Sequence, residues 1–148
     1  MVSFFNRWRG RAKQQNARDD VRKVEADLYN DLGVAVANQV GTSQTQILIY
    51  VVMADGAADY SIRYLAPDKR HVRSLAANGE VALSIIKLQD HVDSLEPEHR
   101  WTAMEYWLDD GEVNIALSYE AVDEDVGQWE RAAPVVEKYF PGLPVEPN

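Results

Sequence analysis

The fold of this chain is decided by residues 101–120, which read WTAMEYWLDDGEVNIALSYE. Two runs in which apolar and polar side chains alternate flank the dipeptide Asp110-Gly111. Because both residues tolerate the positive φ values of a type I′ turn, the pattern predicts a β-hairpin with a two-residue loop. A one-residue slip would turn every side chain to the other face, so the register is well specified. The pairs predicted on one face are Leu108 with Val113, Tyr106 with Ile115, Met104 with Leu117, and Thr102 with Tyr119.

The opposite face of this hairpin carries two tryptophans among carboxylates, which is unusual for the outer side of a sheet. In the predicted register Trp101, Glu105 and Trp107 all point to that face. A later segment of the chain could cover both indole rings. Alternatively, the rings form a docking surface, because tryptophan is enriched at the energetic centres of protein interfaces.

The same alternation predicts a second hairpin earlier in the chain. Residues 44–53 form a β-rich run, residues 59–65 alternate, and Asp55-Gly56 lies between the two runs. With the loop at that dipeptide, one face is again wholly apolar or aromatic. The pairs predicted on that face are Met53 with Ala58, Val51 with Tyr60, Ile49 with Ile62, and Ile47 with Tyr64. The pairs predicted on the other face are Val52 with Asp59, Tyr50 with Ser61, and Leu48 with Arg63.

Three further stretches have helical periodicity. From about residue 12 to residue 40, apolar side chains recur at spacings of three and four. Asn78 is a candidate N-cap for a helix that ends near Leu95, although Asn78-Gly79 is also a hairpin dipeptide. A last helix should follow residue 125, and Pro134 should kink or split it. The predicted apolar stripes are Ala17, Val21, Val24, Leu28, Leu32, Ala35 and Val36; then Val81, Ile85, Leu88, Val92 and Leu95; then Val126, Trp129, Ala133 and Val136.

These elements predict an α+β fold. We expect an antiparallel sheet of about four strands, formed by the two hairpins and packed against the long N-terminal helix, with a connecting helix and a C-terminal helix. The polar and basic stretch 67–74 would be a loop or a short edge strand. A chain of 148 residues can bury one core without disulfides. We therefore expect a single domain over residues 1–148, in which residues 1–18 are a basic and aromatic extension or helix start.

The charge is unevenly distributed along the chain. Residues 1–23 hold seven basic and two acidic residues, a net charge of +5, whereas the rest holds eight basic and 22 acidic residues, a net charge of −14. A folded part with this much negative charge repels nucleic acid and attracts basic proteins. The extension, with Phe4, Phe5 and Trp8 among arginines, is also suited to weak contact with an anionic membrane surface, unless it is a solvated helix start.

The sequence contains no motif that points to catalysis. It has no cysteine, no phosphate-binding glycine loop and no nucleophile-elbow serine. His91 and His99 are the one pair that invites a metal, but Pro97 separates them, so a solvated helix end explains them better. Acidic pairs such as Asp109-Asp110 lie at a turn, where little desolvation would raise a carboxyl pKa. We therefore expect no enzyme, no cofactor and no metal.

The expected location is the cytoplasm. The apolar runs are far shorter than the roughly 20 residues that cross a membrane. The first residues lack the apolar core of a secretory signal. Because the sequence predicts neither a membrane-spanning segment nor a secretory signal, the cytoplasm is the default location.

The order of these segments resembles that of a known family. LYNDLGVAVANQV is followed by ILIYVVMADGAADYSIRYL, then WTAMEYWLDDGEVNIALSYE, and finally WER and VVEKYF. The most telling parts are Trp101-Thr102, the turn at residues 108–111 and the triplet at residues 129–131. Over residues 27–140 the chain resembles the YezG-like immunity proteins, antitoxins that neutralise secreted bacterial polymorphic toxins, commonly nucleases. It departs from that family in its basic extension and in Pro134.

The resemblance implies a protein that binds a cognate toxin domain and blocks its active site or holds it inactive. The family has no catalytic residues. An acidic surface could replace phosphates in front of a basic nuclease cleft, and exposed aromatic rings would provide the dry centre of the interface. An adaptor or chaperone for another secreted partner, or a small metal-dependent hydrolase, are the alternatives. The residues expected to form the partner surface are Trp101, Glu105, Trp107, Asp109, Asp110, Glu112, Asp123, Glu124 and Asp125.

Overall fold

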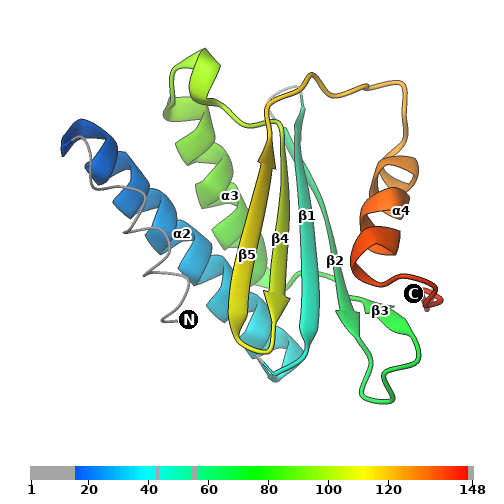
Figure 1. The fold of residues 1–148 in the computed structure, drawn as a ribbon. Coiled ribbons are helices and arrows are strands. Elements are labelled where there is room, and N and C mark those ends of the chain that lie inside the picture. The colour runs from blue at the N-terminus through cyan, green and yellow to red at the C-terminus, as the bar shows by residue number, and fades with distance from the viewer. Residues whose placement is uncertain (1–15, 43, 55–56, 147–148) are drawn as a thin grey trace.

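The computed structural model describes residues 16–42, 44–54 and 57–146. Five strands form one antiparallel sheet in the order β3-β2-β1-β4-β5 (Figure 1). The α+β class is therefore confirmed, and the stretch 67–74 supplies a short fifth strand at one edge. The elements are α2 (Asn16–Val40), β1 (Gln46–Ala54), β2 (Ala57–Leu65), β3 (Val72–Ser74), α3 (Gly79–Ser94), a 3-10 turn η1 (Pro97–His99), β4 (Ala103–Asp109), β5 (Glu112–Ser118) and α4 (Gln128–Tyr139).

Both hairpins have the register that alternation predicts. In the first, β1 pairs with β2 so that Ile49 lies opposite Ile62. In the second, β4 pairs with β5 so that Leu108 lies opposite Val113. Asp110 and Gly111 between them have φ values of 51° and 83°, the positive pair that a type I′ turn requires.

The two hairpins are joined by the pairing of β1 with β4. In that register Ile49 lies opposite Tyr106 and Val51 lies opposite Met104. The apolar faces of the hairpins thereby become one continuous surface. Strands β2, β1 and β4 are the inner strands, so β3 and β5 are the edges of the described sheet.

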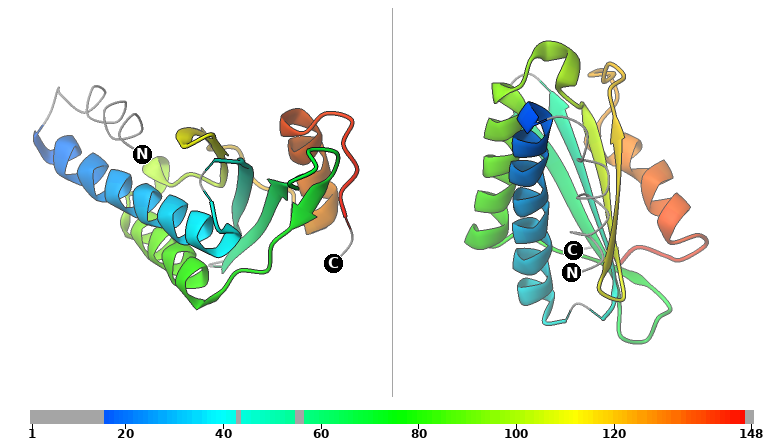
Figure 2. Two further views of the ribbon diagram at one scale, coloured as in Figure 1. Left: turned by 90° about the horizontal axis from the view of Figure 1, so that it is seen from below. Right: turned by 60° about the vertical axis from the view of Figure 1, so that its left-hand side comes forward.

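The sheet lies between two layers of helices. Helices α2 and α3 cover its apolar face, and α4 lies on the opposite face (Figure 2). The main core therefore fills the space between the sheet and the first two helices. It includes Tyr29, Leu32, Ile49, Leu88 and Tyr106, all almost fully buried. The side chain of Tyr106 crosses this core, and its hydroxyl donates a hydrogen bond to the carbonyl oxygen of Tyr29 at 2.8 Å.

The buried face of α2 differs from the predicted stripe. Val24 is 48% exposed, whereas Ala26 and Tyr29, outside the stripe, are buried. A helix wedged between a sheet and a second helix buries a wider face than one stripe of three-and-four spacing, which explains the difference. The expected start near residue 12 and the side chains of Ala17 and Val21 lie outside the described residues. The predicted end is confirmed, since Gly41 has a φ of 99° directly after the helix.

The beginning of α3 decides between the two interpretations of Asn78-Gly79. The Asn78 side chain accepts a hydrogen bond from the backbone N–H of Val81 at 2.9 Å, the geometry of an N-cap. The third hairpin is therefore wrong, and the helix runs to Ser94, close to the predicted end.

Pro134 does not split α4, which is continuous from Gln128 to Tyr139. Its ring lies on the exposed side of the helix, where the carbonyl that it leaves without a donor can be hydrated. The predicted apolar stripe is confirmed at Val136 and wrong at Trp129 and Ala133, which are exposed. The helix instead docks through Ala132, Val136 and, just after its last turn, Phe140.

We expect Tyr106→Phe to lower the free energy of unfolding by about 1 kcal/mol, because it removes a buried hydrogen bond between the sheet and α2. Urea denaturation followed by circular dichroism measures the change. Tyr119→Phe is the matched control, since the Tyr119 side chain is largely exposed and its change should be within experimental error. Equal effects of the two substitutions would contradict a structural role for the Tyr106 hydroxyl.

Candidate functional site

The nine residues predicted for the partner surface lie in three separate places. One group is in or next to β4, the second is at the β4–β5 turn, and the third is in the loop between β5 and α4 (Figure 1). In that order the groups are Trp101, Glu105 and Trp107; Asp109, Asp110 and Glu112; and Asp123, Glu124 and Asp125.

Trp101 is not on the outer face of the sheet. Its side chain is 2% exposed and belongs to the core beneath α2 and α3. Ser118 is the register partner of Ala103, and its carbonyl oxygen also accepts a hydrogen bond from the N–H of Thr102 at 2.7 Å. Thr102 and Ala103 thus both lie opposite Ser118, as in a β-bulge. The alternation of side chains between the two faces of the sheet therefore shifts by one residue at this point. The expected outward position of Trp101 and the pairing of Thr102 with Tyr119 are therefore wrong.

Trp107 points to the predicted face, but α4 covers it. Its ring stacks on Tyr139 with 4.7 Å between centroids and an interplanar angle of 28°. It also meets Phe140 edge-on, with 5.2 Å between centroids. For Trp107, the structure supports the first of the two alternatives, in which a later segment of the chain covers the ring.

Glu105 links β4 to α4. Its Oε1 accepts hydrogen bonds from Nζ of Lys138 and from the hydroxyl of Tyr139, both at 2.8 Å. Burial first, and then Glu105 itself, raises the pKa of the Tyr139 hydroxyl, so this group stays a neutral donor. Because the Lys138 side chain is mostly exposed, that ion pair stabilises the contact only weakly. Glu105 is therefore engaged within the protein.

The remaining predicted residues lie at the start of β5 and in the loop that runs from β5 to α4. Asp110 and Glu112 are exposed at its start, and Asp109 there is partly buried, with Oδ1 at 3.5 Å from Nε2 of Gln46. Residues 123–125 are exposed beyond its end, where Asp123 accepts from the N–H of Asp125 at 3.0 Å. A strand of seven residues spans about 20 Å, so these are two acidic clusters and not one patch.

Strand β5 is an edge strand of the sheet within the described part of the chain. It pairs with β4 alone among the strands that the structure describes. The Ser118 carbonyl faces β4, so antiparallel alternation directs the backbone N–H and C=O groups of Val113, Ile115 and Leu117 away from the sheet. Proteins often block free sheet edges with lysine, proline or a β-bulge. None of these is present within β5 itself. Sequence reasoning missed this edge, because alternation does not reveal which strand is outermost.

The opposite edge is short and covered. Strand β3 has three residues, and the C-terminal segment runs beside it. The N–H of Val72 donates to the Pro144 carbonyl at 2.9 Å, and the Val72 carbonyl accepts from the N–H of Glu146 at 2.7 Å. The two edges thus differ, and β5 is the one that is available for pairing.

The two histidines of the weighed metal cluster lie in different surroundings. Nε2 of His91 is 3.1 Å from Oε1 of Glu25, which links α3 to α2, whereas His99 is exposed in η1. Within the described ranges, no group of three or more histidine, aspartate or glutamate side chains could hold a metal ion. A search of the same ranges finds no helix that is long and apolar enough to cross a membrane.

No protein-family model matches the chain, and no curated protein matches it either. The candidate site is therefore defined by its own geometry. It consists of β5, an edge strand within the described part of the chain, with its outward backbone groups at Val113, Ile115 and Leu117, of the carboxylates at its start, and of residues 123–125 in the loop that follows it. Hereafter this combination is called the β5 edge.

We expect Trp107→Ala to lower the free energy of unfolding by about 3 kcal/mol, because it removes the ring on which the end of α4 packs. Urea denaturation measures the change. Trp129→Ala is the control, since this indole is 69% exposed and should contribute less than about 1 kcal/mol. A Trp107→Ala protein of unchanged stability that fails to bind its partner would instead restore Trp107 as a contact residue.

Proposed function

We propose that this protein is an immunity protein that binds a cognate secreted bacterial toxin, most simply a nuclease domain, and neutralises it by protein–protein contact in the cytoplasm. The observation that carries the proposal is the β5 edge, a strand that pairs on one side alone within the described ranges, with carboxylates at its start and in the loop that follows it. The resemblance of the hairpin segments to YezG-like immunity proteins supports the same conclusion. The two tryptophans no longer support it, because one is in the core and α4 covers the other.

The edge provides the affinity in this proposal. An extended segment of the toxin would pair with β5 and receive main-chain hydrogen bonds from the outward groups of Val113, Ile115 and Leu117. The side chains of Asn114 and Ala116 are exposed on the face of β5 away from α2 and α3, and they are small enough to let a second strand approach. Strand addition of this kind needs no rearrangement of the core.

The acidic clusters provide orientation and speed. A partner with basic groups on both sides of the added strand would meet Asp110 and Glu112 at one end and residues 123–125 at the other. Nuclease clefts bind phosphates and are therefore basic, so carboxylates can occupy them in place of the substrate. Attraction over the acidic body would raise the association rate, and salt would screen it.

An adaptor or chaperone for a secreted partner would use the same edge. The difference lies in the consequence of binding, because only an immunity protein abolishes the toxicity of its partner. Co-expression with a candidate toxin, followed by a survival assay and pull-down, separates the two functions. Survival without toxin activity in the complex supports immunity, and capture of a still toxic partner supports the adaptor.

We expect Ala116→Lys to weaken toxin binding by about tenfold or more, because a lysine on an edge strand hinders the approach of another strand. Isothermal titration calorimetry with the purified toxin domain measures the affinity. Ala116→Ser is the control, since it keeps a small side chain at the same exposed position. If both variants bind as the wild type does, the toxin does not pair with β5.

We expect the triple variant Asp123→Asn, Glu124→Gln, Asp125→Asn to slow association about tenfold at low salt and to reduce its salt dependence. Surface plasmon resonance at several salt concentrations measures both quantities. The control is Asp90→Asn, Asp93→Asn, Glu98→Gln, which removes the same charge from exposed positions around the end of α3. Equal slowing by the two triple variants would show that only net charge matters.

A further inference from the structure

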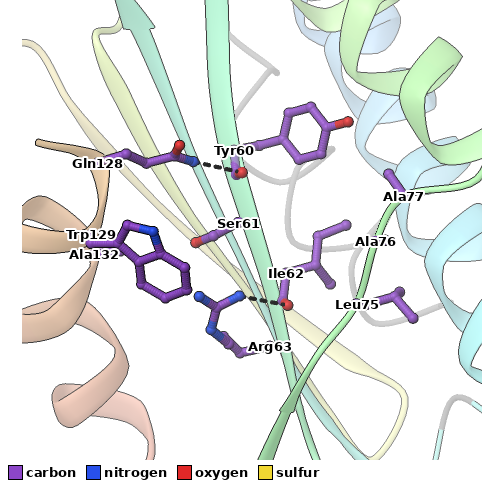
Figure 3. Close-up of a pocket in the computed structure, with 10 residues that line it drawn as sticks. All are labelled: Tyr60, Ser61, Ile62, Arg63, Leu75, Ala76, Ala77, Gln128, Trp129 and Ala132. Carbon is purple, nitrogen blue, oxygen red and sulfur yellow. Dashed lines mark hydrogen bonds between the residues drawn. The ribbon is translucent and has the colours of Figure 1, made fainter. Parts of the chain in front are cut away.

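A pocket of about 450 Å³ lies on the other side of the molecule from the β5 edge, where α4 meets β2 (Figure 3). Its walls come from β2, from the segment between β3 and α3, and from the first part of α4. Volumes of this size are typical of small-molecule sites. Half of the ten lining residues that the structure describes are aliphatic: Ile62, Leu75, Ala76, Ala77 and Ala132.

Arg63 is the one charged side chain that lines this pocket. It is 6% exposed, and its Nη1 donates to the Ile62 carbonyl at 3.3 Å. Its Nε is buried and has no hydrogen-bond partner among the described residues, and no carboxylate in that part of the chain forms an ion pair with it. Burial lowers the pKa of the guanidinium, but an arginine remains charged. Burial of a cation without a counter-ion costs free energy. The pocket therefore lacks an anion that would compensate the charge of Arg63.

Trp129 forms a flat wall over that cation. The Arg63 carbon Cζ lies 4.9 Å from the centre of its ring, and the indole is otherwise largely exposed. Gln128 holds this turn of α4 in place, because its Nε2 donates to the Tyr60 carbonyl at 2.8 Å (Figure 3). An exposed indole that stacks on a buried guanidinium offers one apolar face for a ligand beside one charge.

The surroundings add further positive potential. The first turn of α4 has no side-chain cap, so its N-terminal N–H groups keep their partial positive charge beside Gln128 and Trp129. Arg131 in the next turn has buried Nε and Nη1 atoms without a partner in the described structure. Asp59 is on the same face of β2 as Arg63, but four residues away and exposed. Glu130 in the first turn of α4 and residues 123–125 before the helix offset part of this potential, so the buried guanidinium of Arg63 is the main attraction for an anion.

We propose that this pocket binds a small molecule that carries one carboxylate on an apolar body. The carboxylate would pair with the guanidinium of Arg63, and the apolar body would lie between Trp129, Leu75 and Ala132. A single guanidinium in apolar walls suits a monoanion, because a doubly charged phosphate would bury more charge than one arginine compensates. The site is independent of the immunity role and of the β5 edge.

Titration of the ¹⁵N-labelled protein with phenylacetate and, separately, hexanoate tests the proposal. The affinity is measured from the backbone N–H resonances of residues 61–63 and 75–77, which line the pocket, and the Nε–H resonance of Arg63, assigned by its loss in Arg63→Gln, reports on the guanidinium. We expect a saturable shift with at least one carboxylate at millimolar concentration. The corresponding amide, phenylacetamide or hexanamide, should bind about tenfold more weakly, because it offers no charge-assisted hydrogen bond.

Three variants locate the binding. Arg63→Gln should reduce the affinity about tenfold, and Trp129→Ala should reduce it about threefold through loss of the apolar wall. Arg70→Gln is the matched control, because Arg70 is exposed in the loop before β3, and its affinity should equal that of the wild type. If Arg63→Gln fails to fold, the amide comparison and Trp129→Ala decide, since that indole is exposed.

Several outcomes would overturn the proposal. One is that neither carboxylate shifts the Arg63 resonance. Another is that an amide binds as tightly as its carboxylate, which would make the pocket merely apolar. A third is that Trp129→Ala binds the carboxylate with unchanged affinity. A fourth is that inorganic phosphate gives a saturable shift of the Arg63 resonance while neither carboxylate binds.

Discussion

The pairing of β1 with β4 is the constraint on which the rest of the structure depends. Each hairpin has one apolar face, and an isolated two-stranded hairpin is at best marginally stable in water. Antiparallel pairing with Ile49 opposite Tyr106 joins the two faces into one surface wide enough for both α2 and α3. Tyr106 at the centre of this surface then reaches the backbone of α2 through its hydroxyl.

The second face of the sheet determines the two candidate binding regions. Its apolar residues are few and lie towards the middle, with Leu48 on β1 and Trp107 on β4. One short helix, α4, covers them with Val136 and Phe140. Because α4 lies over β1 and β2, its first turns form a pocket with β2, while β5 lies at the far edge of the described sheet (Figure 1).

Charge separates these regions further. Carboxylates flank β5, whereas the pocket at β2 is built around the buried guanidinium of Arg63. β2 and β5 are three strand spacings apart, or about 14 Å. That distance exceeds the Debye length of about 8 Å at physiological salt, so exposed carboxylates at one edge weaken the field at the other only partly. One small sheet can thus present an acidic edge to a macromolecule and a cationic pocket to a small anion.

The sequence by itself determined the local features: two hairpins with their turns and registers, the N-cap at Asn78, the end of α2 at Gly41 and the α+β class. These follow from side-chain alternation and from backbone preferences of neighbouring residues, which act over a few positions. Of the candidate site, it located both acidic clusters but placed Trp101 on the wrong face. Only the tertiary structure decided the order of the strands, the cover on Trp107, the open edge of β5 and the isolation of Arg63. Each of these depends on contacts between segments far apart in the chain, or on a bulge that interrupts alternation, and periodicity carries no signal of either.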